Sequence, residues 1–202
     1  MRSKPKNIYY HYHAISRGSK EAGNGHKGCV VWLTGLPGSG KSTVADLLDK
    51  ELFRMGCVST ILDGDNIRHG LTSDLGFSGK DRKENIRRIA EVAKLLAENG
   101  QIAIAALISP FRKSRDAARA RMREGDFIEI YLECDPAVCA KRDPKGLYKK
   151  AKAGEIVRFT GVSSPYEGPL KPEIKLDTLS MTPRKCAEMI IEYLAGHGYI
   201  KG

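Results

Sequence analysis

The stretch Gly35-Leu36-Pro37-Gly38-Ser39-Gly40-Lys41-Ser42 decides the fold of this 202-residue chain. An apolar run, residues 29–33, precedes it, and a segment with an apolar residue every three or four positions follows it. Glycines let the backbone curl until several N–H groups point at one anion, and a following helix directs its positive end to the same point. The order strand, glycine-rich turn, helix therefore predicts a phosphate-binding loop.

The side chains of this loop indicate what it binds. Lys41 can reach the β- and γ-phosphates of a nucleoside triphosphate, and the hydroxyl of Ser42 is a natural ligand for Mg²⁺. We therefore expect a nucleoside triphosphate with Mg²⁺. The expected contacts to it are Gly35, Leu36, Pro37, Gly38, Ser39, Gly40, Lys41, Ser42 and Thr43.

Length and composition indicate one α/β domain with no membrane segment. A chain of 202 residues suits a single domain with an ample core. The longest apolar run, residues 102–108, has the length of a buried strand, and the first residues lack the apolar segment of a secretory signal. The five cysteines form no C-x-x-C pair, so we expect reduced thiols in a cytoplasmic protein.

The net charge of +10 comes from two short segments. Residues 1–27 and residues 141–158 each carry a net charge of +5, and the rest of the chain is neutral. A local distribution of this kind does not indicate a broad nucleic-acid-binding face, and no recognition motif accompanies it. We therefore expect neither nucleic acid nor membrane as a partner, and we interpret residues 1–26 as a basic, flexible extension.

Two carboxylates follow a short β-rich run at residues 57–62. Asp63 and Asp65 stand at the carboxyl end of this predicted strand, where ligands bind in parallel α/β sheets. One carboxylate could hold Mg²⁺ while the other accepts a proton from an attacking hydroxyl. An Asx turn or a helix cap is the alternative use of this segment.

Two helix starts are well marked. Ser78 to Asp81 resembles a capping box that opens a long helix with an apolar stripe, ended by Asn99-Gly100. Arg82 and Asn85 lie on its first turn, where they could grip a phosphate or sulfate group or remain solvated. Thr182-Pro183 predicts the start of a C-terminal helix.

Further strands and a lid complete the prediction. Ser109 follows the apolar run at residues 102–108, as a strand-end residue or as a turn former. Residues 145–154 are basic and contain a glycine near each end, as in a hinged lid, although an exposed helical loop is the alternative. We predict a three-layer α/β P-loop fold with a five-stranded parallel sheet, its strands near 29–34, 57–62, 102–107, 127–132 and 173–176.

Four segments together resemble the adenylylsulfate kinases, which make 3′-phosphoadenylylsulfate (PAPS) from adenylylsulfate (APS) and ATP. They are residues 35–42, residues 63–71 (DGDNIRHGL), residues 75–78 with 81–88 (LGFS and DRKENIRR) and residues 142–151 (RDPKGLYKKA). Phe159-Thr160-Gly161 and Tyr166-Glu167 continue the resemblance, which covers the chain from about residue 27 to its end.

The resemblance implies ATP as donor, Mg²⁺ as cofactor and adenylylsulfate as substrate. The catalytic positions would be Lys41, Asp63, Asp65 and Ser109, with Asp63 near the acceptor hydroxyl and Asp65 with Ser42 at the metal. Some relatives are described with a phosphoserine at the position of Ser109, whereas direct in-line transfer needs only positioning and charge neutralisation. Arg142 and Lys145 would contact ATP. The acceptor site would comprise Asp63, Asn66, Arg68, Phe77, Arg82, Asn85, Ile108, Ser109, Lys145, Leu147 and Phe159.

The resemblance also implies a domain over residues 27–202, a lid at about 143–160, a homodimer and a separate ATP sulfurylase. Three other readings remain. Another P-loop kinase, for gluconate, shikimate or a nucleoside, shares the general fold. A GTP-driven switch would need an N-K-x-D segment, which does not occur in the chain. A nucleic-acid-binding module would have to rely on the basic ends alone.

Overall fold

The computed structural model describes residues 7–9 and 11–201. The predicted five-stranded parallel sheet is confirmed, with strand order β2-β3-β1-β4-β5. In chain order the elements are α1 (Arg17–Asn24), β1 (Cys29–Thr34), α2 (Lys41–Arg54), β2 (Ser59–Asp63), the 3-10 helix η1 (Asn66–His69), α3 (Gly79–Glu98), β3 (Ile102–Ala106), α4 (Arg112–Arg119), β4 (Phe127–Glu133), α5 (Pro136–Arg142), α6 (Leu147–Lys152), β5 (Ile174–Asp177) and α7 (Pro183–Gly196).

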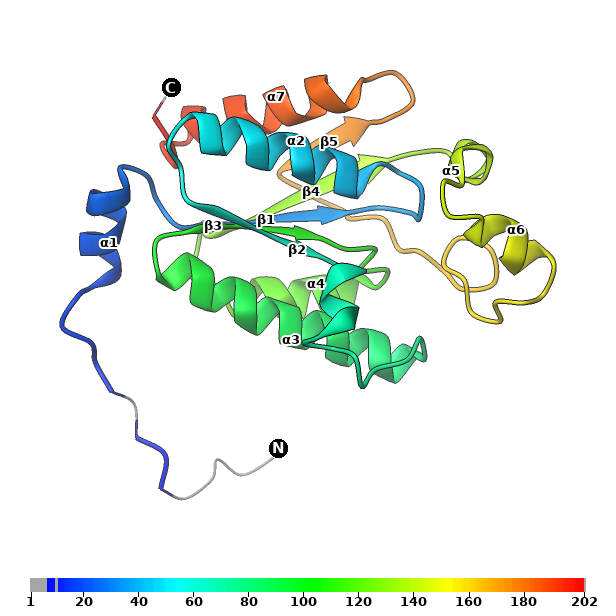
Figure 1. The fold of residues 1–202 in the computed structure, drawn as a ribbon, viewed down its shortest axis with the longest axis horizontal. Coiled ribbons are helices and arrows are strands. Elements are labelled where there is room, and N and C mark those ends of the chain that lie inside the picture. Colours follow the sequence, from blue (N-terminus) through cyan, green and yellow to red (C-terminus); the bar gives the residue numbers. More distant parts are fainter. Residues whose placement is uncertain (1–6, 10, 202) are drawn as a thin grey trace.

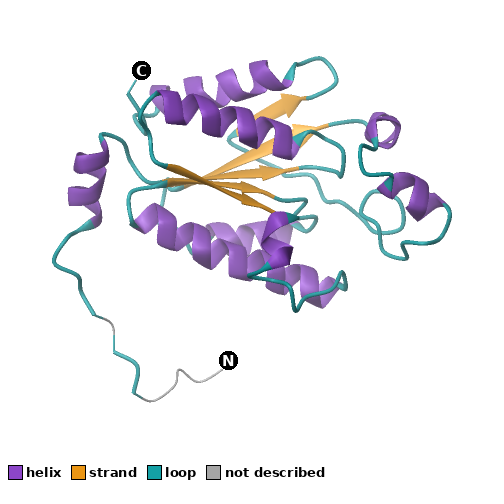
Figure 2. Cartoon of the chain, viewed as in Figure 1, coloured by secondary structure: helices purple, strands orange, loops and turns teal. Residues whose placement is uncertain are grey.

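The sheet is the middle of three layers. α2 and α7 cover one face, and α3 and α4 cover the other (Figures 1 and 2). Alternate residues of β1 serve the two faces: Val31 and Leu33 belong to the core under α2 and α7, and Trp32 to the core under α3 and α4. A strand buried on both faces reads as a continuous apolar run, as observed here. No helix in the described ranges is long and apolar enough to cross a membrane.

All five strands run in parallel, so their carboxyl ends meet at one edge of the sheet. The phosphate-binding loop follows β1 at this edge, Asp63 ends β2, and Ser109 lies three residues after β3. α5 and α6 lie beyond the same edge (Figure 1). The topology therefore brings the predicted functional segments together at the place where α/β proteins bind ligands.

The predicted helix starts are confirmed. Ser78 caps α3, since its side chain accepts the N–H of Asp81 at 3.1 Å. Thr182 caps α7 in the same way through the N–H of Lys185, and Pro183 occupies the first turn. Each cap satisfies an N–H group that has no partner inside its helix.

The second strand begins later than predicted. β2 covers Ser59–Asp63, whereas the sequence suggested 57–62. The N–H of Cys57 donates to the carbonyl oxygen of Leu52 at the end of α2, and the N–H of Val58 donates to His26 Nε2 at 2.9 Å. These two N–H groups are therefore unavailable to a neighbouring strand. The β-rich composition of residues 57–62 thus does not determine where β2 begins.

Residues 17–24, within the segment interpreted as a flexible extension, form the helix α1. Ser16 caps it and Gly25 ends it with φ of 72°. The Arg17 guanidinium donates to both carboxylate oxygens of Asp126, to Glu21 and to the carbonyl oxygen of Gly28. α1 buries none of its residues, so it has no apolar stripe that sequence analysis could detect. Polar contacts hold it against the domain.

We expect Arg17→Ala to lower the free energy of unfolding by about 1–3 kcal/mol, because the change leaves the partly buried Asp126 carboxylate without its partner. Urea unfolding followed by circular dichroism measures this. Lys20→Ala is the control on the same helix, since its hydrogen bond to Asn99 is exposed and contributes little. Equal losses in the two variants would show that Arg17 does not anchor α1.

Candidate active site

The turn between β1 and α2 has the features of a phosphate-binding loop. Gly38 and Gly40 have φ of 78° and 92°, which glycine adopts at little cost. Gly35 has no room for a side chain, since a Cβ there would lie 2.6 Å from the carbonyl oxygen of Leu132. α2 begins at Lys41, so the N–H groups of its first turn open toward the loop. The loop is therefore suited to an anion.

Lys41 is buried within this loop. Its Nζ donates to the carbonyl oxygens of Gly35 at 3.0 Å and Leu36 at 2.7 Å. Burial lowers the pKa of the ammonium group to about 8, because the charged form loses its hydration. A phosphate group in the loop would favour the charged form and raise this pKa.

The two carboxylates after β2 make different contacts. Asp63 Oδ2 accepts a hydrogen bond from the Ser42 hydroxyl at 2.6 Å. Asp63 Oδ1 accepts the N–H of Asp65 at 2.9 Å, which is the Asx turn that the sequence also allowed. Asp65 forms an ion pair with Lys145 of the predicted lid. Asp63 therefore faces the phosphate-binding loop, whereas Asp65 faces the lid.

The donor set at this point fits Mg²⁺. Mg²⁺ prefers hard oxygen ligands and is usually held by one or two carboxylates, water and substrate phosphates. The Ser42 hydroxyl and the Asp63 carboxylate supply such oxygens side by side. Within the described part of the chain no group of three or more His, Cys, Asp or Glu side chains could hold a metal ion. The protein thus offers a partial shell that a triphosphate would complete.

The first turn of α3 is joined to the predicted lid by Arg82. Its guanidinium donates to the backbone oxygen of Arg158 and to Thr160 Oγ1, both at 2.5 Å, and its Nε donates to the oxygen of Phe77 at 3.0 Å. Two chain segments that carry predicted acceptor-site aromatics, Phe77 and Phe159, are thereby connected through one side chain.

Asn85 is buried, although its position in the sequence lies off the apolar stripe of α3. Its Oδ1 is the one buried side-chain oxygen or nitrogen without a hydrogen-bond partner in the ranges 7–9 and 11–201. Buried polar atoms almost always have a partner, so an exception indicates a missing group. The amide of Asn85 is therefore available to a ligand.

The two predicted aromatic residues have different surroundings. Phe77 is 62% exposed, and the Arg68 guanidinium lies 4.4 Å from its ring centroid. Phe159 is buried and packs edge-to-face on Tyr148 with ring centroids 4.9 Å apart. The structure thus presents one accessible ring supported by a cation and one ring that forms part of a small core under the lid.

Ser109 is enclosed by side chains from β1. Its hydroxyl accepts a hydrogen bond from Trp32 Nε1 at 3.2 Å and donates to Thr34 Oγ1 at 2.9 Å. The Thr34 hydroxyl donates in turn to the carbonyl oxygen of Ile108 at 2.8 Å. Ser109 is 2% exposed, so its hydroxyl is a satisfied, buried group at the end of β3.

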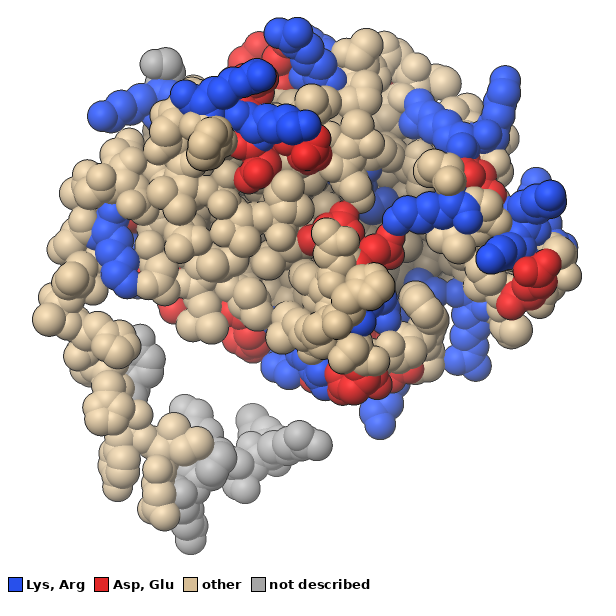
Figure 3. Space-filling model, in the orientation of Figure 1, with Lys and Arg blue, Asp and Glu red and all other residues tan. Residues whose placement is uncertain are grey.

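The predicted lid, residues 143–160, is packed against the phosphate-binding loop. The hydroxyl of the buried Tyr148 on α6 donates to the carbonyl oxygen of Pro37 at 2.9 Å. Arg142, at the end of α5, donates to the carbonyl oxygen of Thr178 at 2.5 Å. Lys and Arg side chains gather at this end of the molecule (Figure 3).

The remaining predicted contacts lie on three other elements. They are Thr43 on α2, Asn66 at the start of η1, and Leu147 at the start of α6.

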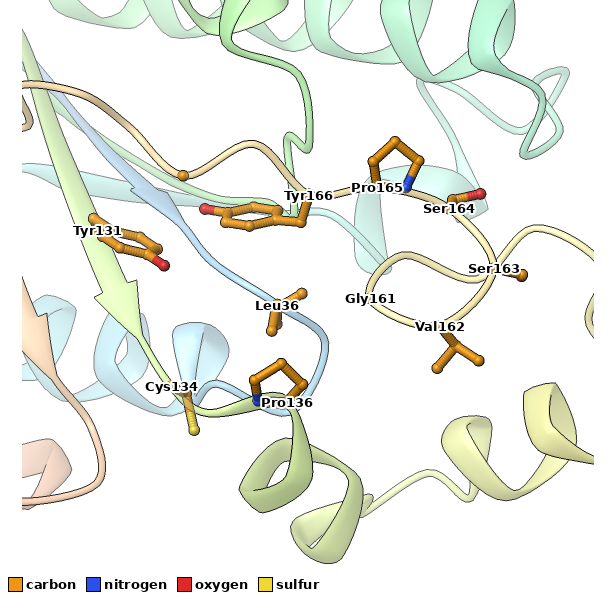
Figure 4. A pocket seen from close by; sticks show the side chains of 11 residues that line it. Leu36, Tyr131, Cys134, Pro136, Gly161, Val162, Ser163, Ser164, Pro165 and Tyr166 are labelled. Carbon is orange, nitrogen blue, oxygen red and sulfur yellow. The ribbon is translucent and has the colours of Figure 1, made fainter.

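A cavity of about 550 Å³ adjoins these residues. Figure 4 shows Tyr131 from β4 and Tyr166 on one side, and Leu36 and Pro136 on the other. The two tyrosine rings are stacked, with centroids 6.1 Å apart. Leu36 is the one predicted site residue in its lining, so this cavity lies beside the candidate site and does not coincide with it.

Sequence reasoning missed the residues that enclose Ser109. Thr34 could have been found, because it is the last residue of β1 and strand ends line the ligand edge. Trp32, Tyr166 and Arg115 had no such signal. Trp32 reaches Ser109 across 77 positions, and Tyr166 reaches Thr34 across 132 positions. Arg115 is only six positions from Ser109, but it lies on α4 and its sequence position does not indicate that its side chain turns back to the Ser109 carbonyl oxygen.

The fold and this site together define a P-loop kinase, with a parallel sheet, a loop shaped for phosphate at the end of β1, and the basic helix α6 packed beside that loop. The family model described as adenylylsulphate kinase matches residues 27–177. The chain therefore belongs to the adenylylsulphate kinase family.

Individual relatives match most of this chain. The adenylyl-sulfate kinase of Geotalea daltonii is 51% identical over 196 residues, which are 97% of each chain. The structure of Mycobacterium tuberculosis APS kinase CysC in complex with AMPPNP and APS has a TM-score of 0.79 at 45% identity, covering 84% of this chain and 98% of the other. The hexameric APS kinase of Thiobacillus denitrificans has a TM-score of 0.67 at 34% identity, over 88% of this chain and 31% of the other.

We expect the affinity for ATP to fall as the pH rises above about 8. Below this pH, Lys41 of the free protein is already charged, and ATP binding takes up no proton. Above it, binding must protonate Lys41, so the Kd should rise by up to about tenfold per pH unit. Isothermal titration calorimetry with ATP, without acceptor and on both sides of this pH, measures the slope.

Lys41→Met is the matched variant for this titration. It should bind ATP weakly and with no dependence on pH in the same range, because the titrating group is gone. If the variant keeps the slope of the wild-type chain, another group takes up the proton.

Proposed function

We propose that the chain transfers the γ-phosphoryl group of ATP to the 3′-hydroxyl of adenylylsulfate, giving PAPS and ADP with Mg²⁺ as cofactor. The observation that carries this proposal is the set of side chains that accompanies the phosphate-binding loop. The set comprises two arginines (Arg68 and Arg82), the exposed ring of Phe77, and the buried amide of Asn85, whose oxygen has no hydrogen-bond partner. This set suits a nucleotide with an anionic tail.

On the donor side, the backbone of residues 35–43 would hold the ATP phosphates. Lys41 would exchange its bonds to Gly35 and Leu36 for phosphate oxygens, and its charge would stabilise the transferring group. Lys145 would leave Asp65 for the same phosphates. Arg142 would contact the donor near the Thr178 segment, to which it is already bonded.

The contacts of the two carboxylates support a division of roles opposite to the one expected from the sequence. Asp63 accepts from the Ser42 hydroxyl, the group that would bind Mg²⁺. We therefore assign Asp63 with Ser42 to the cofactor. Mg²⁺ bound there would neutralise charge on the phosphates. Asp65 would then accept the proton of the 3′-hydroxyl after Lys145 has moved to ATP.

On the acceptor side, Arg82 and Asn85 would bind the phosphosulfate end of adenylylsulfate. The exposed Phe77 ring, with Arg68 over it, would stack on the adenine. Phe159 would form the other wall of the adenine site, held in place by Tyr148. The remaining acceptor contacts would come from Asn66, Ile108, Ser109 and Leu147.

The surroundings of Ser109 support direct transfer of the phosphoryl group. Its hydroxyl is buried and bonded to Trp32 and Thr34. A phosphoserine there would have to break both bonds and desolvate two charges. We therefore propose that Ser109 positions the acceptor and forms no covalent intermediate.

We further propose that the chain forms a homodimer in the cytoplasm and works with a separate ATP sulfurylase. The hexameric state of the Thiobacillus denitrificans relative supports self-association within the family. The five cysteines are free, which agrees with a reducing compartment. Neither nucleic acid nor a membrane is proposed as a partner.

The test is an ADP-release assay with ATP, Mg²⁺ and one acceptor at a time: adenylylsulfate, gluconate, shikimate or a nucleoside. We expect ADP release with adenylylsulfate alone, and mass spectrometry should identify PAPS as the second product. Lys41→Ala serves as the inactive control for contaminating kinases, since it lacks the charge at the transferring group. Turnover with another acceptor and none with adenylylsulfate would overturn the proposal.

The carboxylate assignment predicts two different defects. Asp63→Asn should raise the Mg²⁺ concentration needed for half-maximal rate. Asp65→Asn should lower kcat by on the order of 10²-fold or more at saturating Mg²⁺, because the proton acceptor is lost. Steady-state kinetics over a range of Mg²⁺ concentrations measures both. The reverse pattern would restore the division of roles that the family resemblance suggested.

A further inference from the structure

Arg115 is a fully buried cation on α4, with 1% of its surface exposed. Its guanidinium donates to acceptors on three separate segments. Nε donates to Glu129 Oε1 on β4 at 2.6 Å, one terminal nitrogen to the carbonyl oxygen of Ser109 at 2.6 Å, and the other to that of Glu167 at 2.7 Å. Glu129, which is also buried, balances the charge. The planar guanidinium can serve all three acceptors at once.

The backbone at Ser109 needs such support. Its φ is +39°, and in the described part of the chain Asn7 is the only other non-glycine residue with positive φ. A side chain makes this conformation unfavourable, so it persists where the surroundings hold it. Trp32 and Thr34 hold the hydroxyl of Ser109, and Arg115 holds its carbonyl oxygen.

The Glu167 contact connects Arg115 to the segment that returns from the lid. The N–H of Glu167 donates to the carbonyl oxygen of Pro110 at 2.8 Å, and its carboxylate accepts the N–H of Arg112 at 2.9 Å. The Tyr166 hydroxyl lies 3.0 Å from Thr34 Oγ1, and its ring faces the Arg115 guanidinium. The chain after the lid is thus hydrogen-bonded to the segment that follows β3, and Arg115 donates to both of these segments.

We propose that Arg115 is a positioning residue for the acceptor half of the reaction. Its guanidinium joins the backbone of Ser109, with its unfavourable φ, to Glu167, which follows the lid in the chain. The acceptor site would therefore keep its shape when the lid moves. This inference rests on the proposed function, in which the end of β3 contacts adenylylsulfate. Arg115 itself acts through Ser109 and Glu167 and does not touch the substrate.

Arg119 provides a matched control on the same helix. It also pairs with Glu129, at 3.6 Å, and makes two hydrogen bonds to Glu173, but none to Ser109 or Glu167. Its side chain is 37% exposed. If the loss of any arginine from α4 lowers activity, substitution of either residue should do so. If acceptor positioning is the cause, only substitution of Arg115 should lower activity.

The experiment compares Arg115→Lys with Arg119→Lys in the full chain. Lysine keeps a charge against Glu129 but cannot reach three separated acceptors. We avoid alanine because it would leave the Glu129 charge buried without a partner. For Arg115→Lys we expect kcat/KM for adenylylsulfate to fall by about 10- to 100-fold with the KM for ATP unchanged, since small displacements at a reacting site have effects of this size. Arg119→Lys should leave both constants unchanged.

A second measurement separates positioning from general stability. Arg115→Lys is introduced into Ser109→Ala and into Ser109→Gly. Both backgrounds lack the hydroxyl, and the glycine alone adopts positive φ freely. Each background should keep measurable turnover, because direct transfer needs no serine oxygen. The loss caused by Arg115→Lys should be smaller in the glycine background than in the alanine background.

The outcomes distinguish this inference from the proposed function. A wild-type chain inactive with adenylylsulfate overturns the function, whatever Arg115 does. An active wild-type chain with normal kinetics in Arg115→Lys overturns the positioning role alone. Equal losses in the two Ser109 backgrounds, or a parallel loss in Arg119→Lys, also overturn it, because the effect would then be unrelated to the Ser109 backbone.

Discussion

The parallel pairing of β1 between β3 and β4 is the constraint on which the rest of this structure depends. Val31 pairs with Ile104 on one side and with Ile128 on the other, and both neighbours run in the same direction. The phosphate-binding loop therefore lies between the ends of β3 and β4, and Asp63 lies one strand beyond β3. A shift of one residue in this register would exchange the two faces of the strand. Trp32 would then enter the core under α2 and α7, where Val31 now packs, and Val31 would enter the core under α3 and α4, so neither side chain would fit its new surroundings.

Local patterns in the sequence were sufficient for the fold and for the conformation of the loop at residues 35–42. The glycines and Lys41 of the loop, the cap at Ser78 and the apolar strands each act within a few residues, so their spacing predicts their structure. The helix α1 was not predictable, because its anchor Arg17 reaches Asp126 across 109 positions. The same holds for Arg115 and Glu167. The exposed and buried surroundings of Phe77 and Phe159 also required the folded chain, since residue type alone does not determine them.

Buried cations recur where this fold brings carbonyl oxygens together. Lys41 binds the oxygens of Gly35 and Leu36, and Arg115 binds those of Ser109 and Glu167. The two cations differ in the groups that balance their charge. Arg115 has a carboxylate partner and a complete set of acceptors, which suits a fixed support. Lys41 has neutral oxygens alone and a lowered pKa, which suits a group that changes partners when a phosphate arrives.

The hydrogen bond from Tyr148 to Pro37 is a direct contact between the predicted lid and the phosphate-binding loop. The phenol is buried and its acceptor is a backbone oxygen of the loop that would hold the nucleotide. An outward movement of α6 would therefore remove the hydrogen-bond donor of the Pro37 carbonyl oxygen, which lies in the turn proposed to bind the phosphates. If this segment acts as the proposed lid, entry and exit of the nucleotide would be linked to this one hydrogen bond, and the rate of product release would depend on the loop as well as on the lid.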